Sequence, residues 1–474
     1  MKKAVLSAVL TVSFISMSTL LVGCGGGGGG GSSSPSTGTN QPSVFVGTES
    51  ITIKQCQPQG QPLNLSQVVS LAQYASNPRL VDSFFDNAEF IGAVNPSNDW
   101  TDGWTFGLGK NPSMPSCTTA TVIQGDITGS VTLESGKCYR LKGVVRVKSG
   151  GVLNIQPGVL IYGDKTGIGS FDSLNVERGG KIIAEGTKEK PILFVGKRYL
   201  ESCDTSSGQW GGINIAGFAS TNTGSTENQF EADKSLVYGG NSDNDSSGSL
   251  KYVVLAFGGA EVAPDEEVNG LTLLATGSGT KIEYVQVYNN ADDGVEWFGG
   301  TANAKYLVLI GNEDDNIDTD QGYRGNVQYV YIRQTKVSSN DPRGIEADGL
   351  RTNYNATPYS FLRVANITIE STNSSAHEAI MLRRGTDAQL INVFITGPRS
   401  QACIRINNNA TYQRLSSRNV NSPVFMSVII NNPQQQPNCS TTFRAAGDTG
   451  EVLTFTNTDI QNMFNGYTNN RVIQ

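Results

Sequence analysis

One pattern that occurs twice, 22 residues apart, constrains the fold of this chain more than any other feature. Each copy holds an alternating apolar run, a polar turn with two aspartates, and a second short apolar strand. The turns contain Asp292-Asp293 and Asp314-Asp315, and the second strands begin at Val295 and Ile317. A copy of this length cannot bury its own apolar side, so a neighbouring copy must cover it. The repeat therefore predicts a solenoid of stacked β coils.

The second strand recurs further along the chain, with turns of varying length between the copies. Its first residues are separated by 22, 28, 35 and 24 residues, which is how a solenoid accommodates insertions. Successive side chains of a strand point to opposite faces. We therefore expect the first and third residues of each strand to point inward: Val295 and Trp297, Ile317 and Thr319, Ile345 and Ala347, Ile380 and Leu382, Ile404 and Ile406.

The residue between each inward pair should point outward, and three of these residues are acidic: Glu296, Asp318 and Glu346. Parallel strands stack about 4.8 Å apart, so the three carboxylates should lie close together. Like charges at that distance repel, which raises a pKa or recruits a cation. Calcium accepts such oxygen ligands, so the three residues are candidate calcium ligands. A solvated acidic stripe, with the aspartates of the turns making local hydrogen bonds, remains the alternative.

Short alternating strands closed by Gly and Pro-Gly turns begin at Val122. Several stretches resemble the secreted and lipid-anchored right-handed parallel β-helix proteins of Gram-negative bacteria: 153–158, 208–213, 252–259, 292–300 and 313–325. The resemblance covers roughly residues 122 to 432. It implies an all-β fold, a right-handed parallel β-helix, and it assigns no activity because a fold alone does not settle function.

The outward face is similar in arrangement to that of pectate lyases, in which carboxylates bind calcium and an arginine acts as base. By that similarity, Arg383 and Arg405 are candidate catalytic residues. The next outward positions, Phe298, Asp320 and Asp348, are candidates for contact with a ligand. No lyase sequence motif is matched. The single histidine, His377, accompanies no serine-hydrolase motif, so we interpret it as a structural turn residue.

The first 23 residues read as a signal peptide, with Lys2 and Lys3 before an apolar run. Leu21-Val22-Gly23-Cys24 resembles the lipobox of bacterial lipoproteins, in which Cys24 would be lipidated. An ordinary signal peptide with a chance cysteine is the alternative. Residues 24–47 then form a lipidated, Gly/Ser-rich tether. By resemblance to the sorting rule of enteric bacteria, Gly25 favours an outer-membrane lipoprotein, facing the periplasm or the cell surface.

The charge of the chain argues against one class of partner, and its cysteines predict disulfides. Without Lys2 and Lys3, 33 basic and 42 acidic residues remain, a net charge of −9. This balance argues against a nucleic-acid partner, whose affinity depends on phosphate neutralisation. Six further cysteines in an exported chain predict three disulfides of unknown pairing: Cys56, Cys117, Cys138, Cys203, Cys403 and Cys439.

The sequence on either side of the predicted coils differs from them in its residue pattern. We expect an N-terminal capping region at 48–121, the β-helix at 122–441, and a C-terminal cap at 442–474. The pattern at 66–74 predicts a short helix. Trp100 and Trp104 could form a platform for a sugar, but we favour the interpretation that they cover the open end of the solenoid, since an uncapped end exposes apolar core.

Two classes of function remain. The first is a lipid-anchored surface protein that binds or displays a partner, either a polysaccharide or an envelope protein, and needs no reaction centre. The second is a calcium-dependent polysaccharide lyase or glycoside hydrolase, supported by the acidic and arginine residues of one face. A groove with aromatic walls along that face would favour the second class.

Overall fold

The computed structural model describes residues 43–65, 74–264, 267–336, 342–419, 421–431, 443–449 and 452–453, and the single positions 456, 458 and 463. The predicted signal peptide, Cys24, most of the tether and of the C-terminal cap, Cys439 and nearly all of the helix expected at 66–74 lie outside this set. Among the described residues, we find no helix with the length and apolar character that a membrane span requires.

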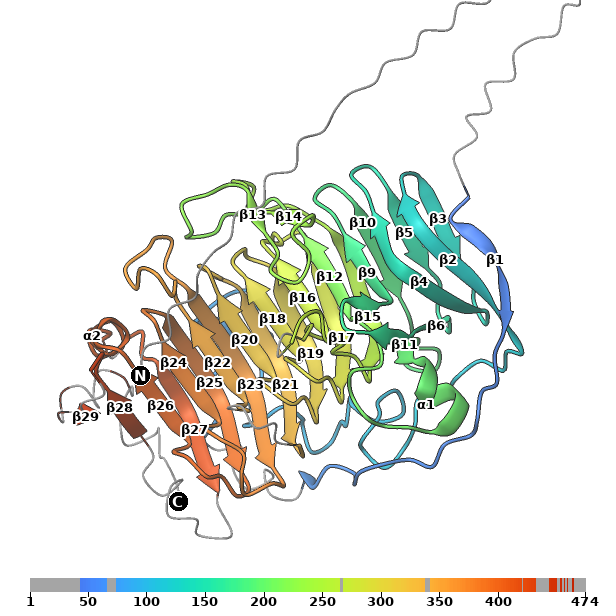
Figure 1. Ribbon diagram of the computed structural model, residues 1–474. Helices are drawn as coiled ribbons and strands as arrows, with labels where there is room; N and C mark the ends of the chain where they lie inside the picture. The colour runs from blue at the N-terminus through green and yellow to red at the C-terminus, as the bar shows by residue number, and fades with distance from the viewer. Residues whose placement is uncertain are drawn as a thin grey trace, which may run out of the picture. The chain divides into compact units, whose positions relative to one another are not determined.

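Parallel strands stack in chain order and form the predicted right-handed β-helix (Figure 1). One face, which we call the ladder sheet, is built from one short strand per coil, each paired in parallel with the next. Its strands are β4 (Cys138–Val147), β9 (Ser173–Val176), β12 (Ile213–Ala216), β16 (Leu271–Leu274), β18 (Val295–Phe298), β20 (Ile317–Asp320), β22 (Ile345–Asp348), β24 (Ile380–Arg383), β26 (Ile404–Asn407) and β28 (Phe443–Ala446).

The rest of each later coil is one long strand that bends at a single residue of positive φ. These strands form the bent sheet: β15 (Gly248–Ala256), β17 (Lys281–Tyr288), β19 (Asn303–Ile310), β21 (Asn326–Gln334), β23 (Phe361–Ser371), β25 (Asp387–Thr396) and β27 (Phe425–Asn431). The bend residues stack from coil to coil: Tyr252, Tyr284, Tyr306, Tyr329, Asn366, Asn392 and Ser427. In the first coils the same faces are made by β2 (Thr119–Ile127), β3 (Ser130–Leu133), β5 (Val152–Ile155), β6 (Leu160–Gly163), β10 (Lys181–Glu185) and β11 (Ile192–Gly196).

Smaller elements decorate the coils. They are β1 (Phe45–Ser50), the 3-10 helix η3 (Pro78–Leu80), β7 (Lys165–Gly167), β8 (Ser170–Phe171), α1 (Lys197–Ser202), β13 (Asn228–Gln229), β14 (Val237–Tyr238), α2 (Asn409–Ser416) and β29 (Val452–Leu453). The excursion that carries β13 and β14 packs Phe230 and Tyr238 over Phe298 of the ladder sheet.

The predicted inward positions form the core. Val295 pairs with Ile317, Ile317 with Ile345, Ile345 with Ile380 and Ile380 with Ile404, in the register expected from the repeat. All five side chains are fully buried in one continuous apolar cluster. Each coil therefore covers the apolar side of its neighbour, which confirms the prediction made from the 22-residue repeat.

Most of the segment expected to cap the end of the solenoid instead runs along the bent sheet. Trp104 packs edge-on against Tyr252 and Tyr284, and Trp100 packs edge-on against Tyr284 and Tyr306. These rings belong to middle coils, so the tryptophans do not cover an open end. Trp104 is fully buried and presents no surface to a sugar.

Side-chain amides of the bent sheet hold the backbone of this N-terminal segment. Gln286 accepts a hydrogen bond from the amide of Phe106 and donates one to its carbonyl. Asn392 makes the same pair of bonds with Ser76. Buried polar groups need such partners, so the segment is a fixed part of the fold. At the first coil, β1 pairs antiparallel with β2 and covers its edge.

Two of the predicted disulfides join described cysteines. Cys56 is bonded to Cys203, which ties the N-terminal segment to the end of α1, and Cys117 is bonded to Cys138. Cys403 is also disulfide-bonded.

A charge at an inward position should unfold the stack. Ile317→Asp would place an unpaired carboxylate in the core, so we expect the free energy of unfolding to fall by at least about 3 kcal/mol in chemical denaturation. The matched control Ile317→Val should cost about 0.5–1.5 kcal/mol. An aspartate variant as stable as the valine variant would show that this position does not face the core.

Candidate metal centre on the ladder sheet

The predicted acidic ladder is present in the expected register. Glu296 of β18 pairs with Asp318 of β20, and Asp318 pairs with Glu346 of β22. These side chains point away from the core, yet Glu296 and Glu346 are only 8% and 4% exposed, and Asp318 is half-buried. The ladder is therefore neither an open groove nor a flat solvated stripe.

A second acidic column lies beside the ladder, in the turns that lead into these strands. Asp293 and Asp315 each stand two residues before their strand and are buried. The Oδ1 of Asp293 accepts a hydrogen bond of 2.8 Å from the amide of Asp315, and the Oδ1 of Asp315 accepts one of 2.8 Å from the amide of Arg343. The turn aspartates thus link one coil to the next, and the Oδ2 of Asp315 lies 3.9 Å from the Nη1 of Arg343.

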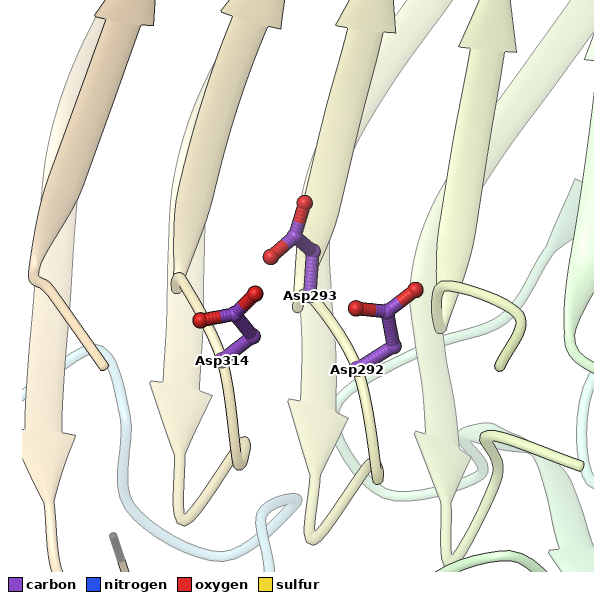
Figure 2. A group of neighbouring side chains, drawn as sticks. All are labelled: Asp292, Asp293 and Asp314. Carbon is purple, nitrogen blue, oxygen red and sulfur yellow. The ribbon is translucent and has the colours of Figure 1, made fainter. Parts of the chain in front are cut away.

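The two columns converge into three groups of carboxylates. In each group one oxygen from every member lies within 4.8 Å of the others. The groups are Asp292, Asp293 and Asp314, shown in Figure 2; Asp293, Glu296 and Asp318; and Asp315, Asp318 and Glu346. Asp293 and Asp318 each belong to two groups. The three carboxylates expected from the sequence, Glu296, Asp318 and Glu346, therefore do not form one group. Glu296 and Asp318 lie with Asp293, and Asp318 and Glu346 lie with Asp315.

Arginines neutralise the C-terminal part of this cluster. Glu346 pairs with the Nη1 of Arg343 at 2.6 Å and with Arg383, whose Nε lies 2.8 Å from Asp348. Arg384 also pairs with Asp348. Long guanidinium side chains reach across neighbouring columns, so the carboxylates of β22 are already provided with positive charge.

Among the described residues, Asp292, Asp293, Glu296 and Asp318 make no ion pair. Burial, followed by the charge of neighbouring carboxylates, raises the pKa of Asp292, Asp293 and Glu296 well above the ordinary range. Burial and the charge of Asp320 raise the pKa of Asp318 to about 7. Without a cation, this part of the cluster must hold protons at neutral pH.

The donors present fit a hard divalent cation. All are carboxylate oxygens, which calcium and magnesium prefer and which soft metals do not require. The Oδ1 of Asp318 is buried and has no hydrogen-bond partner among the described residues. A buried acceptor without a partner costs free energy, so an ion beside Asp293, Glu296 and Asp318 would satisfy it. We therefore regard these three residues as the best candidate ligands.

The other residues singled out in the sequence lie in the same region but are engaged. Arg383 is paired as described above, and Arg405 pairs with Glu378 at 3.3 Å. Phe298 is buried beneath Phe230 and Tyr238, and Asp348 is buried between two arginines. Asp320 is half-buried, and burial raises its pKa to about 6. Of the three residues predicted to contact a ligand, Phe298, Asp320 and Asp348, Asp320 is therefore the one that a ligand can reach.

The raised pKa values predict that the metal-free protein loses stability as the pH rises. An aspartate has a pKa of about 3.9 in an unfolded chain, whereas the pKa of Asp318 in the fold is about 7. Between these values the folded state holds more protons than the unfolded state, so the free energy of unfolding falls with increasing pH. Chemical denaturation in metal-free buffer should show this fall from about pH 4 to about pH 7.

The substitution Asp318→Asn provides the control, since it removes one titrating group and should make the pH dependence shallower. A free energy of unfolding that rises over the same interval would contradict the raised pKa.

A comparison with family models gives one match. Residues 125–470, well over half of the chain, match the model described as a pectate-lyase-like β-helix domain. Comparisons with curated proteins and with solved structures find no match. The family fits a polysaccharide-related protein and is compatible with a lyase or hydrolase, but it establishes no activity. The chain belongs to the pectate-lyase-like β-helix family.

Proposed function

We propose that this protein binds an acidic polysaccharide through a calcium ion held on the ladder sheet. The observation that carries the proposal is the group of carboxylates without an ion pair among the described residues: Asp292, Asp293, Glu296 and Asp318. When bound, calcium would supply positive charge to these carboxylates and a coordination position for a carboxylate of the ligand. The family supports a polysaccharide as the class of ligand.

The chain's own residues prepare this site. Asp293 is fixed by the hydrogen bond that it accepts from the backbone amide of Asp315 in the next coil. Glu296 is fixed by Asn269, whose Nδ2 donates to it at 2.5 Å. Ligands that are already oriented lose little conformational freedom on binding, so the site is preorganised. Asp318 and Asp320 are half-buried, which leaves a path from solvent to the cluster.

A calcium-dependent lyase is the second candidate, because one observation favours it. Burial and the neighbouring Arg384 lower the pKa of Arg383 to about 10, toward that of a usable base. However, Arg383 is engaged by both Glu346 and Asp348. A base must be free to approach the proton that it removes, so the structure favours binding over catalysis.

We also propose that the binding face is displayed from the outer membrane by a lipid on Cys24. The Leu21-Val22-Gly23-Cys24 sequence supports this location. Cys24→Ala should release the protein from the membrane fraction and abolish labelling with a fatty-acid analogue. A variant that still fractionates with membranes would contradict the anchor.

An array of acidic and neutral glycans, probed with and without calcium, tests the ligand class. We expect polyuronates to be retained in calcium and at least tenfold less in chelator, and neutral glycans to be retained in neither. Ultraviolet absorbance of unsaturated products from the same polyuronates tests the lyase. Polyuronate retention that calcium does not increase would contradict the proposal, and steady product formation would make the lyase the correct function.

Calcium should stabilise the fold by mass action, by roughly 3 kcal/mol at a hundredfold excess over its dissociation constant. Asp318→Asn should weaken this effect, because it removes a ligand charge. In metal-free buffer the same variant should be neutral or slightly stabilising, since it relieves repulsion between stacked carboxylates. Thermal melts in both buffers measure this crossover.

Asp126→Asn is the matched control, because Asp126 is exposed in the first coil, outside the cluster. It should behave like the parent protein in both buffers. Equal melting temperatures of the parent protein in calcium and in chelator would rule out the metal site.

A further inference from the structure

A second candidate binding site lies near the C-terminal end of the described coils. A polar cavity of about 780 Å³ opens between α2 and the loop that follows β22. This volume is typical of sites for small ligands, which range over about 300–1,000 Å³. The amide of Gly385 donates to the Thr411 hydroxyl at 2.7 Å, and the amide of Arg384 donates to Asn408 at 2.9 Å. These bonds fasten α2 to the turn after β24, so one wall of the cavity is anchored to the coils.

Two arginines line this cavity without an acidic partner. Arg351 and Arg414 make no ion pair among the described residues, in contrast to the paired arginines of the ladder sheet. The Arg414 guanidinium lies 3.7 Å from the centre of the Tyr359 ring, and its Nη1 is buried without a hydrogen-bond partner. The ring orients the guanidinium, as does the Oδ1 of Asn355, which accepts from Nη2 at 3.4 Å, and Nη1 is left as an unused donor.

The remaining walls suit a sugar. Asn355, Asn409 and Gln413 supply amides that both donate and accept, as sugar hydroxyl groups require. Tyr354 supplies a half-buried ring beside them. One acidic side chain, Asp448, also lines the cavity. Two arginines against one aspartate leave an excess of positive charge, although the chain as a whole carries a net charge of −7.

We infer that this cavity binds a carboxylate-bearing saccharide, such as a uronic acid unit, directly through arginine and without a metal. Arg414 offers its charge and its unused Nη1 donor to a carboxylate, the exposed Arg351 adds a second charge, and the amides bind ring hydroxyls. The ligand class is the one given under the proposed function, but the site is separate from the ladder and does not depend on calcium.

Isothermal titration with a galacturonic acid tetramer in chelator tests this site apart from the ladder. The parent protein should bind the tetramer in a saturable manner. Arg351→Gln and Arg414→Gln should each weaken binding by at least tenfold, because each removes a charge-assisted contact. Arg351 is exposed, so its replacement leaves the packing of α2 intact. Arg79→Gln is the control: Arg79 is an exposed arginine on the N-terminal segment, and its replacement should change nothing.

Three further measurements can overturn the inference. Equal affinity for a neutral galactose tetramer would show that the site does not recognise the carboxylates of the saccharide. Displacement by inorganic sulfate at the same affinity as the tetramer would reduce the site to an anion site. Loss of binding in Asp318→Asn would assign the binding to the ladder. Absence of saturable binding in chelator would remove the C-terminal site, while calcium-dependent binding to the ladder could still be observed.

Discussion

The parallel register between coils is the constraint on which the rest of the structure depends. Backbone hydrogen bonds place equivalent residues of neighbouring coils about 4.8 Å apart, whatever their side chains are. Where the residues are apolar, as in the column that contains Ile317 and Ile345, the register builds the core. Where they are tyrosines, it stacks the rings, with centroids 4.2 Å apart for Tyr284 and Tyr306. Where they are acids, it forces carboxylates together against their repulsion.

That regularity explains which features the sequence could predict. Strand alternation sorts every residue of a short strand to one face, so the inward anchors and the stacking of Glu296, Asp318 and Glu346 follow from spacing alone. The repeat shows that Asp293 and Asp315 are equivalent, but the contribution of Asp293 was missed, because aspartates in turns ordinarily make local hydrogen bonds and were not expected to join the ladder. Their shared spacing of two residues before each strand was the available signal.

Other features depend on contacts between distant parts of the chain, which carry no periodic signal. The N-terminal segment packs on middle coils because Gln286 and Asn392 bind its backbone. The sequence of a strand that contains one glutamine or asparagine does not indicate which distant segment that side chain will bind. The pairing of Arg383 with Glu346 and Asp348 was missed for a similar reason, since a long side chain can reach several columns. Arg383, a candidate catalytic residue in the sequence, instead forms ion pairs with Glu346 and Asp348.

The central claim is that an ion, rather than a set of shared protons, balances Asp293, Glu296 and Asp318. Anomalous diffraction from crystals grown in calcium, with a second data set from metal-free crystals, tests it most directly. We expect an anomalous peak in the calcium crystals at about 2.3–2.6 Å from oxygens of these residues, and none in the metal-free crystals. Carboxylates in direct hydrogen-bond contact with one another in both crystals, with no peak between them, would contradict it.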